Sequence, residues 1–384
     1  MILEETTIAE ATEWRRDFHR HPELLFDVDR TAKRVAELLC SFGCDEVASG
    51  IGRSGVVAVV RGSEASDSRM IGIRADMDAL PIREDTALPY ASTCRKHMHA
   101  CGHDGHMAML LGAVKHLAAT RAFRGTLVAI FQPAEEGGGG AKVMIDDGLF
   151  ERFPVDEVYA LHNMPGLDVG TFALSSDVMF AASDRFDIRI VGKGGHAARP
   201  HETIDPIHIA SHLIYALQTV VSRKSDPVDP IVVSVTSIHA GEAYNVIPAD
   251  AILKGSVRTL SEACRDNAEK CITEMAKRIS AAFGAAAEVE YRRGYPPTVN
   301  HFAQARILGE AAARVVGDAA VQCNMRPIMG AEDFSYMLKA RPGAVILMGN
   351  GQTAPLHHPK YDFNDKSLPL GMALWINVVT QGSV

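Results

Sequence analysis

The first forty residues carry apolar side chains at the spacing of a helix. In the second half of this segment they recur every three or four residues, at Leu24, Val28, Thr31, Val35 and Leu38. This spacing places them on one face of a helix. Pro22 interrupts the pattern and suits the first turn of a new helix. The pattern therefore predicts two helices over residues 8–39.

Beyond this segment, strand-like and helix-like patterns alternate. Short runs rich in β-branched and other apolar residues lie at 56–60, 70–74, 126–131, 158–161 and 344–348. Helical patterns lie between them, over 107–117 and 141–145. Alternation of this kind is typical of a sheet whose faces are covered by helices. It predicts an α/β fold with a mixed, largely parallel sheet flanked by helices.

The pattern changes near Ser183 and returns after Pro296-Pro297. The stretch between them reads strand, helix, strand, strand, helix, strand. Its strands are expected at 187–191, 231–238, 251–258 and 288–291, and its helices at 206–222 and 261–283. This order predicts a two-layer α+β unit. We therefore expect an inserted domain over 184–295, within a larger domain formed by 1–183 and 296–384.

Length, net charge and cysteine content narrow the possible classes of protein. The 384 residues exceed the size of most single cores, which agrees with two domains. The net charge of −8 argues against a general affinity for nucleic acid or anionic membranes. No secretory signal and no apolar run of about 20 residues is visible. The seven cysteines are scattered, without a CxxC pair. We expect a cytoplasmic protein with reduced thiols.

Residues able to bind metal or move protons follow the expected strands. Asp76 and Asp78 follow 70–74, and Glu135 and Glu136 follow 126–131. His162 follows 158–161, His357 follows 344–348, and Cys101 and His103 lie in a loop before a helix. Ligands of open α/β sheets bind beyond the carboxyl ends of the strands. A thiol, several imidazoles and paired carboxylates suit two borderline-soft divalent ions and the water that they activate.

The pair Glu135-Glu136 suits a division of labour. Adjacent side chains of an extended segment point in opposite directions. One carboxylate can therefore bind metal while the other moves protons. The four glycines that follow allow tight turns and the close approach of a substrate.

These segments resemble the hippurate hydrolase branch of the aminoacylase-like metallopeptidases. The resemblance rests on His-Ala-Cys-Gly-His-Asp at 99–104, Gln-Pro-Ala-Glu-Glu-Gly-Gly at 132–138, Leu-His-Asn at 161–163 and Leu-His-His-Pro at 356–359. It is supported by Arg-Ala-Asp-Met-Asp-Ala-Leu-Pro at 74–81, Gly-Gly-His-Ala at 194–197, Asn-Val-Ile-Pro at 245–248 and Gly-Ala-Glu-Asp-Phe at 330–334. The motifs occur in order along nearly the whole chain.

The resemblance implies a role for each matching position. The family's metal ligands correspond to Cys101, His103, Glu136, His162 and His357. Glu135 corresponds to the general base, and Asp78 to an acidic residue that orients a ligand. In the inserted lid, His196 corresponds to a histidine that steadies the oxyanion, and Asn245 and Arg258 lie where the lid contacts substrate.

Neighbouring residues are expected to play lesser parts. Asp76 stands where other branches carry a histidine, so it is not counted as a ligand. His106 falls one helical turn after His103 and is expected to face the loop. Asp104 either orients a ligand imidazole or is an ordinary loop carboxylate. His19 is expected to be structural.

The resemblance implies a zinc-peptidase-like catalytic domain that hydrolyses N-acyl-L-amino acids, with N-benzoylglycine as the first substrate to test. It implies two divalent ions per chain, of zinc, manganese, cobalt or nickel. It also implies a homodimer, or a dimer of dimers, formed through the lid. The alternatives are a dipeptidase, an N-acetyl-diaminopimelate deacetylase, a metal-binding protein without turnover, and a protein with one structural zinc on Cys101.

Overall fold

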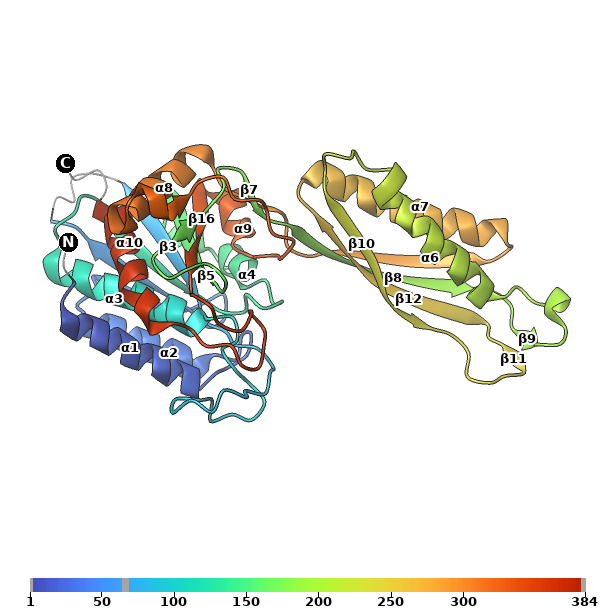
Figure 1. Cartoon of the computed structure of the whole chain (residues 1–384), viewed down its shortest axis with the longest axis horizontal. Coiled ribbons are helices and arrows are strands. Elements are labelled where there is room, and N and C mark those ends of the chain that lie inside the picture. The colour runs from blue at the N-terminus through green and yellow to red at the C-terminus, as the bar shows by residue number, and fades with distance from the viewer. Residues whose placement is uncertain (1–2, 64–68, 381–384) are drawn as a thin grey trace. The chain divides into compact units, whose positions relative to one another are not determined.

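A computed structural model describes residues 3–63 and 69–380 and divides into two compact units (Figure 1). The first unit comprises Met1–Met179, Val299–Arg326 and Asp333–Val384. The second comprises Phe180–Thr298 and the short segment Pro327–Glu332. The sequence places that short segment in the larger domain, whereas the structure groups it with the second unit.

The first unit is built on a mixed sheet of eight strands. Their order is β1-β2-β4-β3-β5-β16-β6-β15. The bounds are β1 Glu46–Ile51, β2 Gly55–Arg61, β3 Met70–Asp76, β4 Thr126–Gln132, β5 Glu157–Met164, β6 Phe172–Ala173, β15 Val321–Gln322 and β16 Gly343–Gly349. The four central strands β4, β3, β5 and β16 run parallel to one another. The predicted α/β fold with a largely parallel sheet is therefore confirmed.

Helices cover this sheet, which explains why its central strands are buried along nearly their whole length. All residues of β16 and nearly all of β2, β3 and β4 are buried, as expected for strands covered on both faces. The helices of this unit are α1 Glu5–Arg20, α2 Asp29–Ser41, α3 His103–Thr120, α4 Gly140–Asp146, α5 Leu149–Arg152, α8 Phe302–Val316, α9 Ser335–Ala340 and α10 Leu368–Thr380. Helix α3 packs against β3 and touches both α1 and α10.

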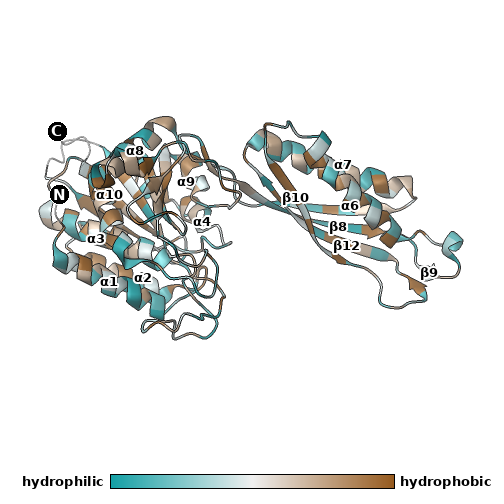
Figure 2. Cartoon of the chain, viewed as in Figure 1, coloured by the Kyte–Doolittle hydropathy of each residue, from teal (hydrophilic) through white to brown (hydrophobic). Residues whose placement is uncertain are grey.

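The second unit is a two-layer structure. Its antiparallel sheet has the order β10-β12-β8-β13, and helices α6 and α7 pack on one face. The bounds are β8 Ala182–Val191, α6 Pro206–Arg223, β10 Ile231–His239, β12 Asp250–Thr259, α7 Glu262–Ala282 and β13 Ala286–Arg293. Along β8, Phe186, Ile188 and Ile190 are buried, while Arg185 and Arg189 face away from the helices. Figure 2 shows this alternation of apolar and polar residues along the strands.

Side-chain caps fix where these two helices begin. The carboxylate of Asp205 accepts hydrogen bonds from the backbone of Ile207 and His208 at the start of α6. The hydroxyl of Ser261 accepts one from the backbone N–H of Cys264 at the start of α7. Both caps satisfy N–H groups that have no partner inside the helix. The remaining short strands are β7 Val178–Phe180, β9 Gly195–His196, β11 Val246–Ile247 and β14 Thr298–Val299.

Candidate metal centre

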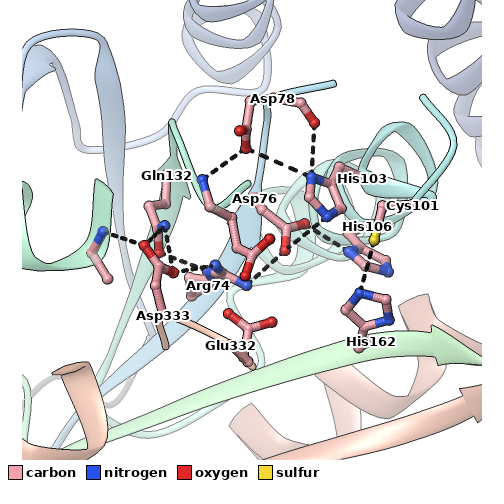
Figure 3. A network of polar contacts seen from close by, with 12 residues as sticks. Arg74, Asp76, Asp78, Cys101, His103, His106, Gln132, His162, Glu332 and Asp333 are labelled. Atoms are coloured by element: carbon pink, nitrogen blue, oxygen red, sulfur yellow. Dashed lines mark hydrogen bonds and ion pairs between the residues drawn. The ribbon is translucent and has the colours of Figure 1, made fainter. Parts of the chain in front are cut away.

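The candidate site lies beyond the carboxyl ends of the central strands of the first unit. Asp76 is the last residue of β3, and Glu135 and Glu136 follow the end of β4 within four residues. His162 lies near the end of β5, and His103 is the first residue of α3. Figure 3 shows the cluster that these strands and the helix hold together. This is the edge at which the sequence predicted the site.

All five residues expected to be ligands come together here. Donor atoms of Cys101, His103 and His162 lie within 4.8 Å of one another. Donor atoms of Cys101, Glu136 and His357 form a second group of the same size. The two groups share the sulfur of Cys101. Two overlapping groups with one thiol in common suit a pair of divalent ions with a shared ligand.

Two buried polar atoms of the site also indicate that it can hold a metal ion. His103 Nε2 and Glu136 Oε1 have no hydrogen-bond partner, although both are shielded from solvent. They lie 4.0 Å apart, and Glu136 Oε1 is 3.3 Å from His357 Nε2. A buried polar atom that makes no hydrogen bond is costly. A metal ion between these atoms would remove that cost, so the residues present fit the group that the site is expected to hold.

Backbone carbonyl groups fix the direction of two imidazoles. His103 Nδ1 donates to the carbonyl of Asp78 at 2.8 Å, and His162 Nδ1 donates to the carbonyl of Asn163 at 2.7 Å. Each ring therefore turns its Nε2 atom toward the cluster, and His162 Nε2 lies 3.4 Å from the Cys101 sulfur. Hydrogen bonds of this kind set the tautomer and orientation of metal-binding histidines.

Asp78 shapes the turn that carries the two glutamates. Its carboxylate accepts the backbone N–H of Glu135 at 2.9 Å and that of Glu136 at 3.1 Å. The residue before them, Ala134, has a φ of +56°, a strained conformation for a residue other than glycine. Burial raises the pKa of Asp78. The structure thus shows Asp78 holding the glutamates through its carboxylate and His103 through its carbonyl.

The electrostatics favour a cation at this place. Burial, reinforced by the carboxylates of Glu136 and Glu135, raises the pKa of Cys101 well above its usual value. Burial also lowers the pKa of His162 to about 3, which leaves a neutral imidazole. Burial would also lower the pKa of His103. The carboxylate of Asp76 and the hydrogen bond with Asp78 outweigh burial and raise this pKa to about 10. Since a thiolate is the metal-binding form of cysteine, Cys101 would lose its proton on binding a cation.

Sequence reasoning missed the part played by His106. We expected it to face the loop, but its ring is buried, so this expectation is wrong. His106 Nδ1 lies 2.7 Å from Asp76 Oδ1, and the backbone N–H of Asn163 donates to His106 Nε2 at 3.0 Å. Asp76 also accepts from Arg74 at 2.7 Å, and its Oδ2 is 3.6 Å from His103 Nε2. The three-residue spacing of His103 and His106 on one helix was the available signal.

Asp104 does not orient a ligand. Its carboxylate is buried, accepts from His19 Nδ1 at 2.8 Å and lies 3.5 Å from a guanidinium nitrogen of Arg15. The alternative that it holds a ligand imidazole is therefore wrong. Asp104 instead joins the start of α3 to α1, and His19 has the structural role expected of it.

The three expected substrate contacts belong to the second unit. His196 lies in β9, and its Nδ1 accepts from the backbone N–H of Ala198 at 3.0 Å. Asn245 precedes β11, and Arg258 lies in β12. Their roles in binding substrate remain predictions.

Comparison with known proteins identifies the family. The model of peptidase family M20/M25/M40 matches residues 72–381. The chain belongs to this family. Proteins that resemble it include the hippurate hydrolase of Campylobacter jejuni, 43% identical over 92% of this chain and 91% of the relative. The N-acetyldiaminopimelate deacetylase of Streptococcus sanguinis is 37% identical over 93% of this chain and 94% of the relative.

A solved structure of the same family supports the interpretation of the site. A dinuclear metal binding peptidase of Bacillus subtilis superposes with a TM-score of 0.86 at 33% identity, covering 98% of both chains. The match confirms the fold of a metal-dependent hydrolase. Among the described residues, no helix has both the length and the apolar composition to cross a membrane.

Proposed function

We propose that this chain hydrolyses the amide bond of N-acyl-L-amino acids, either hippurate-like or N-acetylated, and releases a carboxylic acid and a free amino acid. The observation that carries the proposal is the convergence of Cys101, His103, Glu136, His162 and His357, with the carboxylate of Glu135 beside His103 and Glu136. The similarity to a hippurate hydrolase supports this choice among linear amides.

The five donors would hold two divalent ions of zinc, manganese, cobalt or nickel. Such ions polarise the amide carbonyl and lower the pKa of the attacking water. The protein's own part is to hold the donors rigidly. The backbone carbonyl of Asp78 fixes the ring of His103, and that of Asn163 fixes the ring of His162. The glutamate turn is fixed in the same way by the carboxylate of Asp78.

Glu135 is the proposed general base. It is 6% exposed, and its carboxylate belongs to a group with His103 and Glu136 whose ligand atoms lie within 4.8 Å of one another. It takes the proton of the attacking water as the oxygen bonds to the amide carbon. It then returns this proton to the amide nitrogen as the carbon–nitrogen bond breaks. One carboxylate thus carries the proton from nucleophile to leaving group.

The second unit is proposed to recognise the rest of the substrate. His196 is assigned to the oxyanion, and Asn245 and Arg258 to the substrate's polar groups. Arg258 suits a carboxylate because a guanidinium donates two parallel hydrogen bonds, and burial and the charge of Arg185 lower its pKa. Among the described residues, the one hydrogen bond of the Arg258 guanidinium goes to the backbone carbonyl of Val257. Arg189, on the same sheet face, instead contacts two carboxylates.

The proposal is tested by adding Mn²⁺, Zn²⁺, Co²⁺ or Ni²⁺ to metal-stripped protein with a panel of benzoyl- and acetyl-capped amino acids, N-acetyl-diaminopimelate and dipeptides. We expect metal-dependent release of an amino acid from capped substrates. Selective cleavage of N-acetyl-diaminopimelate would favour an N-acetyl-diaminopimelate deacetylase instead. The similarity to the Streptococcus sanguinis enzyme supports this alternative. Cleavage of dipeptides alone would favour a dipeptidase. Failure on the whole panel would reject the proposed function.

We also infer a homodimer, or a dimer of dimers, formed through the second unit. Strand β10 lies at the edge of its sheet, where its outer backbone groups can pair with another chain. Large apolar side chains of this unit are exposed, among them Tyr215, Val228, Val232 and Ile238. A cytoplasmic location agrees with the seven free cysteines.

A further inference from the structure

Asn163 touches two of the segments that carry metal donors. Its backbone carbonyl accepts the Nδ1–H of His162 at 2.7 Å. Its side-chain nitrogen donates to the backbone carbonyl of Cys101 at 2.6 Å. The residue is fully buried, so water does not compete for these bonds. One asparagine therefore links the backbone that carries the thiol to the imidazole that faces it.

Tyr361 fixes the side chain of Asn163. The tyrosine hydroxyl donates to Asn163 Oδ1 at 2.6 Å, and the ring is fully buried. The Cys101 carbonyl can only accept, so the Asn163 amide must turn its nitrogen toward Cys101 and its oxygen toward Tyr361. Tyr361 lies four residues after His357. The contact thus joins a third donor-bearing segment to the first two.

His106 fixes the backbone of Asn163. The backbone N–H of Asn163 donates to His106 Nε2 at 3.0 Å, so in the neutral ring this nitrogen carries no proton. His106 Nδ1 is then the protonated atom and donates to Asp76 at 2.7 Å. A continuous chain of buried hydrogen bonds runs from the end of β3 through His106 and Asn163 to Tyr361.

The packing at Gly102 leaves these groups no room to shift. Gly102 has a φ of +86° and separates the donors Cys101 and His103. A β-carbon at this position would lie 2.3 Å from Asn163 Nδ2 and 2.4 Å from the Tyr361 hydroxyl. The amide and the hydroxyl therefore press directly against the loop that presents the thiol.

We propose that Asn163, held by Tyr361, is a positioning residue that sets the distance between the Cys101 sulfur and His162 Nε2. It thereby controls retention of the ion held by Cys101, His103 and His162. It acts less strongly on the group formed by Cys101, Glu136 and His357. That group shares the Cys101 sulfur, but its other two ligands, Glu136 and His357, make none of these contacts. The inference rests on the proposed metal centre and not on the choice of substrate.

The test removes one hydroxyl group by the substitution Tyr361→Phe. Tyr159→Phe is the matched control: Tyr159 is equally buried, and its hydroxyl binds Glu157 instead of a residue of the site. The first measurement is zinc content per chain after dialysis against a weak chelator. The second is the alkylation rate of Cys101 in metal-free protein, followed by peptide mass spectrometry. The second measurement needs neither metal nor substrate.

For Tyr361→Phe we expect zinc content to fall from two ions per chain toward one, and Cys101 alkylation to become at least about tenfold faster. Tyr159→Phe should leave both values unchanged. Asn163→Asp keeps the acceptor for Tyr361 but loses the nitrogen that contacts both the Cys101 carbonyl and His106 Nε2. It should lose the same ion. Should it fail to fold, Tyr361→Phe alone still decides.

A zinc content in Tyr361→Phe equal to that of the wild type, or an unchanged Cys101 alkylation rate, would overturn the inference. The outcome is independent of the proposed function. A protein that holds two ions yet cleaves no member of the substrate panel would refute the proposed function and leave this inference standing. A protein that holds none of zinc, manganese, cobalt and nickel would refute the metal centre, and the alkylation rates would still decide whether Asn163 positions Cys101.

Discussion

Glu135 and Glu136 are neighbours in one turn of the chain, and the proposed mechanism assigns them different tasks. Asp78 binds the backbone N–H of both residues, so neither substitution should disturb the turn itself. For Glu135→Gln we expect kcat to fall by roughly a hundredfold to ten-thousandfold with two ions retained, because an amide cannot accept the proton. For Glu136→Gln we expect loss of metal. Steady-state kinetics with elemental analysis checks both, and near-normal kcat in Glu135→Gln contradicts the assignment.

His19 supplies a pH dependence of stability. Burial alone would lower its pKa, but the carboxylates of Asp104 and Glu84 raise it to about 9. The folded pKa thus lies above the ordinary value of about 6.5. The stabilisation is complete below about pH 6.5 and is lost as pH rises through about 9. It amounts to at most about 3 kcal/mol.

The stability difference between the wild type and His19→Gln should therefore shrink between pH 6.5 and pH 9.5. Urea unfolding at several pH values measures it. His21→Gln is the control, since His21 is partly exposed and its Nδ1 bonds the Asp17 carbonyl of its own helix. A difference that stays constant over this range would show that His19 gains no proton on folding.

At the residue scale, the clustering of the expected donors and the supporting place of Asp78 could be predicted. The support that Asn163 and Tyr361 give could not. Cys101 and His103 stand two residues apart in a loop before a helix, and such a pattern signals metal chemistry. Asn163 carries no comparable signal, because its partner Tyr361 lies 198 residues further along the chain. Only the folded backbone brings these two together.

At the scale of elements, the start of α3 is where an added side chain would disturb the site most. Gly102→Ala would place a β-carbon within 2.4 Å of Asn163 and Tyr361 at a φ of +86°. Gly148 starts α5 with a φ of +88°, but the nearest atom to a β-carbon there is 3.9 Å away. Both alanine variants carry similar backbone strain, of about 1–3 kcal/mol. Only Gly102→Ala adds crowding.

We therefore expect Gly102→Ala to lower the melting temperature more than Gly148→Ala does, and to lose metal as well. Calorimetry and elemental analysis of the two variants side by side measure the effect. Equal melting temperatures and equal metal contents would show that the loop adapts to the added methyl group without consequence for the site.

Elements with a continuous apolar run or an alternating pattern followed from the sequence, and the two-residue strands did not. Strand β4 covers Thr126–Gln132, within one residue of the expected run, because continuous apolar residues mark a covered strand. The two-residue strands β6 and β15 are too short to show a period. Helix α3 starts at His103 and not at Met107, because its first turn carries polar side chains of the site and therefore lacks the apolar pattern.

At the scale of the whole molecule, the exposed apolar residues of the second unit predict self-association. Light scattering should give twice the mass of one chain, or four times for a dimer of dimers. Tyr215→Glu should shift the mass toward the monomer, because Tyr215 is 80% exposed on α6 and a charge there opposes burial in an interface. Phe302→Glu, at a residue 72% exposed on the first unit, is the control. A monomeric wild type would reject the dimer.

The order in which the strands leave the ribosome has a consequence for biosynthesis. Strand β16 pairs with both β5 and β6, yet it is made after the entire segment Phe180–Thr298. The second unit is almost complete in sequence before the first unit can close its sheet. We expect the nascent chain to show an open edge at β5 throughout this interval. Chaperones that bind exposed strands should therefore engage the emerging polypeptide until residue 349 is translated.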